Sequence, residues 1–137
     1  MSIELNKQTA RRFYEAIQRV DYAAAAQLCH PDFVFYLQTD TPIHGADGFI
    51  ASEKKNFDAF PGFSFQIERM VAEGDQVAAY LVFDGEHTSS VIDGIAPAGK
   101  RLRFSLLMLL TISEGKIIEK RAHFDRLDIH RQLSGEP

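Results

Sequence analysis

The chain has 137 residues, of which 45% are hydrophobic, so residues 1–137 are expected to form one folded domain with a substantial core. Its formal charge is −4 and no segment is dense in Lys and Arg, which argues against nucleic acid as a partner. The longest apolar run, within residues 105–112, is far shorter than the roughly 20 residues of a membrane helix, so no membrane contact is expected.

The first half of the chain has mainly helical spacing. Apolar residues recur every three or four positions over Leu5–Val20, which predicts an amphipathic helix. Asp21 is a suitable N-cap for a second, alanine-rich helix over Tyr22–Leu28. The composition of residues 30–37 predicts a short strand, and helical spacing returns over Ala46–Phe60.

Cys29 is the only cysteine, so the chain cannot form an internal disulfide. The first residues do not show the charged, apolar and small-residue pattern of a secretion signal. The sequence therefore predicts a protein of the reducing cytoplasm.

The second half of the chain has the pattern of strands. Residues 63–75 alternate apolar and polar side chains, and "EGD" predicts a tight turn into a strand over residues 76–88. A loop then precedes a strand at residues 100–112, and the turn "SEGK" leads to a last strand over residues 117–127. Helices first and strands afterwards predict an α+β domain with an antiparallel sheet.

The strand at residues 100–112 contains "LLMLL", which is apolar on both faces. A strand with one wet face should alternate, so something besides the N-terminal helices is expected to cover the second face. One explanation is extra curvature that closes the sheet over itself. The other, which we favour, is a homodimer in which two sheets pack together.

No common catalytic motif is present, since GxSxG, HExxH, CxxC, GxGxxG and a Walker loop are all missing. The last predicted strand instead carries Glu119, Arg121, His123 and Asp125 on one face, because alternate strand residues point the same way. If this face is solvated, the row is an ordinary charged surface; if it lines a cavity, His123 and Asp125 form a candidate acid and base. His123 and Asp125 could also bind a metal ion, but two ligands without a third are weak evidence for one. Neither a metal nor a cofactor is therefore predicted.

Three further residues are candidates, each with a structural alternative. His87 ends a predicted strand and is either a hydrogen-bonded end of the core or a group that faces a ligand. His44 precedes a predicted helix, and Tyr14 lies on the apolar stripe of the first helix, where its hydroxyl would need a partner. Exposure for His44 and core packing for Tyr14 are the simpler explanations, and ligand binding is the functional one.

The segments "AEGDQVA", "GEHT", "GIAPAGK" and "FDRL", in this order, closely resemble the SnoaL-like polyketide cyclases of the nuclear-transport-factor-2-like superfamily. The resemblance runs from about Asn6 to Leu133. It implies a cone in which N-terminal helices pack on a curved antiparallel or mixed sheet that encloses an apolar pocket, commonly in a homodimer. It also implies a small-molecule substrate, a moderately apolar carbonyl compound, that undergoes a cofactor-free intramolecular aldol ring closure.

The resemblance also implies roles for individual residues. The aspartate of "FDRL", Asp125, would be the general acid/base, and the histidine of "GEHT", His87, would face the ligand or handle a proton. Asp125 is then expected to point into the cone and to bring His123, as a polarising or relay group, and Arg121, as a ligand-binding group, with it. If Arg121 and Asp125 are buried together, the carboxylate is expected to stay ionised and to act as a base.

The chain differs from many of these relatives because it has no tryptophan. Around the terminal aspartate it has Arg121, His123 and Phe124 instead, which predicts a more polar pocket. Ketosteroid isomerases, limonene epoxide hydrolases and dehydratases share the cone but not the reaction, and a cone that only binds a ligand is the alternative from a different class.

Overall fold

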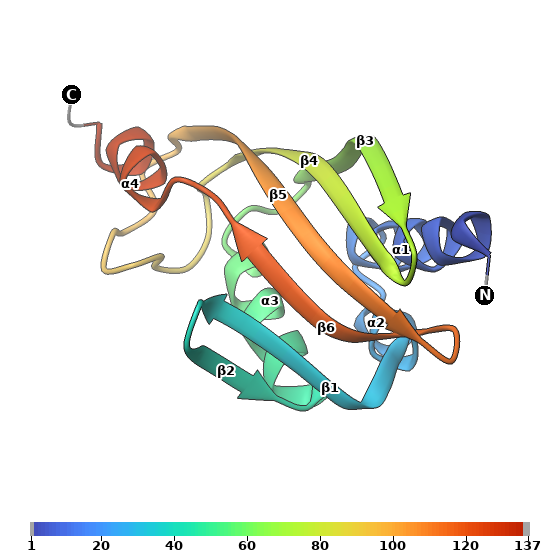
Figure 1. Cartoon of the computed structure of the whole chain (residues 1–137). Helices are drawn as coiled ribbons and strands as arrows, with labels where there is room; N and C mark the ends of the chain where they lie inside the picture. Colours follow the sequence, from blue (N-terminus) through green and yellow to red (C-terminus); the bar gives the residue numbers. More distant parts are fainter. Residues whose placement is uncertain (1, 136–137) are drawn as a thin grey trace.

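The computed structural model describes residues 2–135, which fold into one curved sheet with three helices on one face and a fourth helix at one end (Figure 1). In chain order the elements are α1 (Ile3–Gln18), α2 (Tyr22–Gln27), β1 (Cys29–Gln38), β2 (Thr41–His44), α3 (Ala46–Asp58), β3 (Ser64–Glu73), β4 (Gln76–Glu86), β5 (Arg101–Ser113), β6 (Lys116–His123) and α4 (Arg126–Ser134). The predicted α+β class is confirmed.

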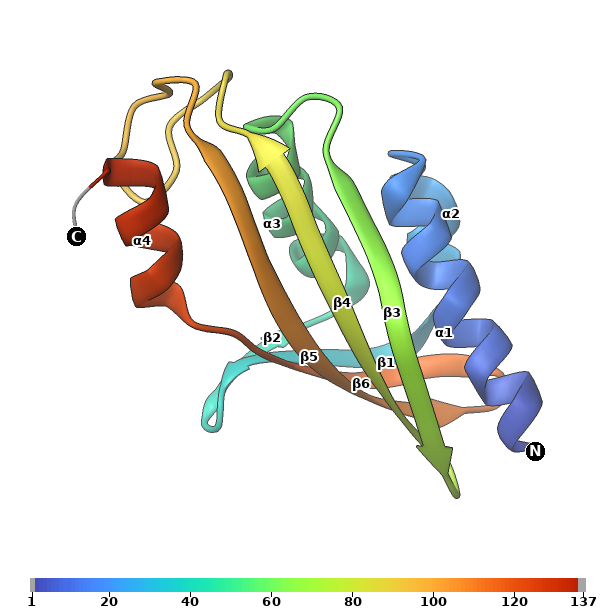
Figure 2. The ribbon, with the colours of Figure 1, turned by 90° about the horizontal axis from the view of Figure 1, so that it is seen from above.

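The sheet has six strands in the order β2-β1-β6-β5-β4-β3. All neighbours are antiparallel except β1 and β6, which run parallel, so the sheet is mixed. The two long hairpins, β3-β4 and β5-β6, make up most of it. Figure 2 shows that the sheet bends strongly and does not close on itself.

Helices α1, α2 and α3 lie against the concave face of the sheet, behind it in Figure 1. Two of them begin at side-chain caps, where Ser2 Oγ accepts from the Leu5 backbone N at 3.1 Å and Asp21 Oδ1 accepts from the Ala24 backbone N at 3.1 Å. The N-cap predicted at Asp21 is therefore confirmed. None of the helices within residues 2–135 is long and apolar enough to cross a membrane.

Aromatic side chains fill the space between these helices and the concave face. Phe83 of β4 is 3% exposed, and its ring centroid lies 5.1 Å from that of Phe60, 5.4 Å from Phe104 and 5.8 Å from Phe63. Edge and stacked contacts of this kind are the preferred geometries of aromatic pairs. The concave face of the sheet is thus the hydrophobic core of the domain.

Two elements differ from the sequence-based prediction. The hairpin strand β2 was not predicted, because it is short and carries a proline, which only an edge strand tolerates. The predicted last strand at residues 117–127 ends at His123 instead. Asp125 is the N-cap of α4, with Oδ1 accepting from the Asp128 backbone N at 3.0 Å, so "FDRL" turns into a helix.

The face of the sheet that points away from α1, α2 and α3 is called the outer face below. The alternation within "LLMLL" divides β5 between the two faces. Leu106, Met108 and Leu110 are buried in the core, whereas Leu107 and Leu109 are 50% and 36% exposed on the outer face. Tyr80, which pairs with Leu107 on the neighbouring strand β4, is also exposed there. The outer face of a single chain is therefore an uncovered surface with an apolar centre.

Candidate functional site

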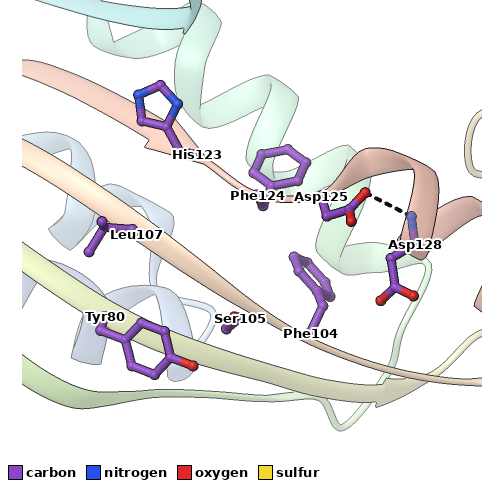
Figure 3. A pocket seen from close by; sticks show the side chains of 8 residues that line it. All are labelled: Tyr80, Phe104, Ser105, Leu107, His123, Phe124, Asp125 and Asp128. Atoms are coloured by element: carbon purple, nitrogen blue, oxygen red, sulfur yellow. Dashed lines mark hydrogen bonds between the residues drawn. The ribbon is translucent and has the colours of Figure 1, made fainter.

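A hollow of about 620 Å³ opens where the chain leaves β6 and turns toward α4. The β5-β6 ladder ends at the pair Leu107 and His123, so the next residues of the two segments are no longer joined by strand pairing. We call this space the outer hollow, because Tyr80, Ser105, Leu107 and His123 contribute to it from the outer face (Figure 3). Its other lining residues are Phe104, Phe124, Asp125 and Asp128.

The turn between β6 and α4 places two carboxylates in the outer hollow. Asp125 is exposed and uses one oxygen to cap α4, which leaves its Oδ2 without a partner among residues 2–135. Asp128 lies one turn further on, and its Oδ2 accepts from Gln132 Nε2 at 2.8 Å. The N-terminus of a helix stabilises negative charge, so this end of the hollow is suited to an anionic base.

His123 lines the outer hollow from its other end. In Figure 3 the Phe124 ring lies between the imidazole and the Asp125 carboxylate, and neither an ion pair nor a hydrogen bond joins the two groups within the described part of the chain. The predicted pair therefore shares one hollow, although its members do not contact each other. A ligand in the hollow could touch both.

The walls between these polar groups are apolar. The ring centroids of Phe104 and Phe124 lie 6.0 Å apart, and Phe104 continues to Phe83 of the core at 5.4 Å. Leu107 forms a further part of the wall. The outer hollow thus combines carboxylates and an imidazole with aromatic and aliphatic surface, which suits a moderately apolar ligand that carries oxygen groups.

The prediction that Asp125, His123 and Arg121 point into the cone is wrong. Beyond the register shift at Ile117–Glu119, the buried side chains of β6 are those of Lys120 and Ala122, so Arg121 and His123 lie on the outer face, and Asp125 is exposed beyond the end of the strand. The sequence did not reveal this orientation, because the odd-numbered and the even-numbered residues of the segment both mix polar and apolar side chains. Only packing against the helices distinguishes the two faces.

Arg121 does not reach the outer hollow. Its guanidinium stacks on the Tyr36 ring at 3.9 Å from the centroid and pairs with Glu119 Oε1 at 3.2 Å. No interaction joins Arg121 to Asp125 among residues 2–135, so the two are not buried together as the sequence analysis considered. Arg121 instead forms part of the outer face next to the apolar centre.

His87 is completely buried and does not line the outer hollow. Its Nε2–H donates to the Ser90 carbonyl oxygen at 2.7 Å, and its ring packs on Phe60 with centroids 5.3 Å apart. The His87 backbone bonds to Lys100 and Gly99, which closes the base of the loop at residues 88–99. These contacts match the structural alternative, a hydrogen-bonded end of the core.

Replacing His87 with phenylalanine should keep the ring contact and remove the hydrogen bond to the loop. We expect the variant to unfold about 0.5–1.5 kcal/mol more easily, because the hydrogen bond to the Ser90 carbonyl is lost. The measurement is urea denaturation, together with limited proteolysis of the loop at residues 88–99. His44→Phe is the matched control and should stay within about 0.5 kcal/mol of the parent, since His44 is exposed. Equal stability of the two variants would contradict the loop-anchoring role.

The two remaining candidates lie elsewhere. Tyr14 is 2% exposed in the core, and its hydroxyl finds no hydrogen-bond partner among the described residues. Burial raises the pKa of this hydroxyl well above its usual value, and the charges of Glu53 and Cys29 add to the shift. His44 is exposed on the edge strand β2, opposite Val34.

Sequence reasoning missed three polar residues of the outer hollow. Tyr80 and Ser105 come from β4 and β5, and their only signal was a polar group at a position that alternation turns outward. Asp128 lies three residues after Asp125, a spacing typical of the first turn of a helix, which the assignment to a strand concealed. Residues 2–135 contain no group of three or more potential metal-binding side chains.

The fold is that of a small cone-shaped α+β protein of the nuclear-transport-factor-2-like type. A model of the SnoaL-like polyketide cyclase family matches residues 7–133, and the chain belongs to that family. The predicted family is thereby confirmed. No curated protein matches the sequence.

Solved structures share this fold over nearly the whole chain. AclR from Streptomyces galilaeus superposes with a TM-score of 0.88 at 24% identity, over 99% of this chain and 100% of its own. A provisionally assigned SnoaL-like polyketide cyclase from a Jannaschia species gives 0.89 at 23% identity, over 100% and 97%. An LEH-like epoxide hydrolase of M. tuberculosis gives a TM-score of 0.73 at 19% identity, over 98% of this chain and 92% of its own. At these identities the similarity shows the fold.

Proposed function

We propose that the chain is a cofactor-free acid/base enzyme that acts on a small, moderately apolar carbonyl compound in the outer hollow. Intramolecular aldol ring closure is the proposed reaction, in keeping with the family to which the chain belongs. The observation that carries the proposal is the outer hollow itself, in which Asp125 and His123 flank the apolar walls formed by Phe104 and Phe124.

In this reaction the free oxygen of Asp125 removes a proton from a carbon next to a carbonyl group, which gives an enolate. The enolate carbon attacks a second carbonyl carbon of the same molecule and forms the new C–C bond. The resulting alkoxide then takes a proton from His123 or from the protonated Asp125. No electrons are gained or lost, so the reaction needs no redox cofactor.

The alternative is a protein of this fold that binds a small molecule without changing it. One observation favours it: the Asp125 carboxylate already has a structural task as the N-cap of α4, and both Asp125 and His123 are exposed. Another reaction of the wider superfamily, such as epoxide opening, would use the same carboxylates with a different substrate.

Proton exchange in heavy water distinguishes the acid/base enzyme from the non-catalytic binding protein without knowledge of the natural substrate. A set of small cyclic and open-chain diketones is incubated in D₂O with and without the protein, and loss of the α-proton signal is followed by NMR. The proposal predicts exchange above the buffer rate that increases in proportion to protein concentration. Exchange at the buffer rate for every compound that binds would favour the non-catalytic alternative.

We further propose that the protein is a homodimer that packs outer face against outer face, in the cytoplasm. The support is the exposed apolar centre formed by Tyr80, Leu107 and Leu109, which lie on neighbouring positions of β4 and β5. A second copy over this face would also cover part of the outer hollow, because Tyr80 and Leu107 belong to both. The predicted dimer and the predicted site are therefore linked.

A further inference from the structure

Lys120 is the only fully buried Lys, Arg, Asp or Glu side chain within residues 2–135, with 2% exposure. It points from β6 into the core, on the side of the sheet opposite the outer hollow. Its Nζ lies 4.8 Å from the ring centroid of Phe35, 5.0 Å from that of Phe49 and 3.5 Å from Met108 Sδ. No oxygen of the described residues accepts a hydrogen bond from this amine.

Such an environment is costly for a charged amine. A buried ammonium normally has a carboxylate or several oxygen acceptors, because its lost hydration must be replaced. Around Lys120, two aromatic faces and a thioether replace much less of this hydration than oxygen acceptors would. Burial accordingly lowers the pKa of Lys120, and the charge of Glu53 opposes the shift without forming an ion pair with the amine.

Other polar groups near Lys120 also lack ordinary partners. Glu53 of α3 acts electrostatically on both Lys120 and Tyr14, and burial raises the pKa of its carboxyl group. The Tyr14 hydroxyl is buried without a partner. Cys29 is not the reactive member of this group, since burial raises the pKa of its thiol to about 11.

We propose that Lys120 is a nucleophilic amine that captures a small aldehyde or ketone as an imine, in a second site on the concave face of the sheet. The amine lone pair attacks the carbonyl carbon and forms a C–N bond. The two amine hydrogens leave with the carbonyl oxygen as water, and a C=N bond remains. A desolvated lysine is the usual form of such a nucleophile, and the proposal does not depend on the chemistry of the outer hollow.

Phe49 of α3 covers Lys120 and is itself 1% exposed, with its ring centroid 5.3 Å from that of Phe33 and 4.9 Å from that of Phe35. A compound that reaches the amine has to displace part of this packing, so the proposed site is restricted to compounds of a few carbon atoms.

Reductive trapping on the full chain tests the proposal. The folded protein is treated at pH 7 with acetaldehyde and limiting cyanoborohydride, which reduces an imine to a stable secondary amine, and peptide mass spectrometry quantifies each lysine. We expect Lys120 to be modified several-fold faster than Lys55, an exposed lysine of α3, because burial lowers the pKa of Lys120 and leaves more of its amine neutral at pH 7.

The pH dependence gives a second readout. Between pH 7 and pH 9 the neutral fraction of a solvated lysine amine rises about 100-fold, whereas that of an amine with a lowered pKa rises less. The ratio of Lys120 to Lys55 modification should therefore fall as the pH rises. In denaturant, where all lysines are solvated, the ratio should approach one.

Lys120→Met is the matched variant, since methionine fills a similar length of apolar space. It should keep the circular-dichroism spectrum of the parent and lose only the fast-reacting adduct. Modification of Lys120 that is no faster than that of Lys55 in the folded protein would overturn the proposal and leave Lys120 as a structural cation over two aromatic rings.

Discussion

Replacing Asp125 with asparagine is expected to lower protein-catalysed α-proton exchange by about 10²–10⁴-fold, the usual contribution of a positioned acid or base. Asparagine caps a helix as well as aspartate does, so α4 should stay folded while the group that accepts the proton is lost. The measurement is the NMR exchange rate, combined with thermal unfolding to show that stability is unchanged.

Two further variants separate catalysis from capping. Asp125→Ala should lose the exchange activity and also about 1 kcal/mol of stability, because α4 loses its cap. Asp128→Asn removes the neighbouring carboxylate and should affect exchange less. If Asp125→Asn exchanges protons at the parent rate while Asp128→Asn does not, the base is Asp128; if neither variant changes the rate, the outer hollow does not perform acid/base chemistry.

The second prediction concerns neighbouring residues of β5. Leu106→Glu is expected to abolish stable folding, because it places an unpaired charge in the core at a cost of about 4 kcal/mol or more, out of a typical 5–15 kcal/mol. Leu107→Glu is expected to leave the fold intact and to convert the proposed dimer into a monomer, since Leu107 is half exposed on the outer face. Light scattering and circular dichroism measure the two effects.

Leu109→Glu is the control for this pair. Leu109 lies on the outer face but does not line the outer hollow, so its replacement should also give a monomer without a direct change in the site. Comparison of ligand binding in the Leu107 and Leu109 variants then shows whether dimer formation itself completes the site. A parent protein that is already monomeric, or outer-face variants that remain dimeric, would contradict the proposed sheet-to-sheet packing.

Local patterns in the sequence determined most of the elements. The spacing of apolar residues over Leu5–Val20 and the alternation over residues 63–88 report which side of a helix or strand faces a core, and neither depends on distant partners. Asp21 was identifiable as a cap for the same reason, because capping is a contact within one turn. The segments "AEGDQVA", "GEHT", "GIAPAGK" and "FDRL" indicated the family, which the match over residues 7–133 confirms.

The sequence could not determine where β6 ends or which of its faces is buried. Asp125 fits an extended strand as well as the first turn of a helix, and the choice depends on how α4 packs against β5. Lys120 occupies a core position that polarity alone would assign to solvent, because Phe35 and Phe49 cover it from β1 and α3.

The outer hollow was decided by tertiary structure alone. Its residues come from β4, from β5, from the end of β6 and from the start of α4, segments that the antiparallel pairing of three strands brings together. The sequence supplied the histidine and the aspartate that line it, but both were expected inside the cone. His123 lies outside because it alternates with the buried Ala122 on β6. Asp125 lies outside because the pairing of β5 with β6 ends at His123, and the chain beyond that point turns away from the sheet into α4.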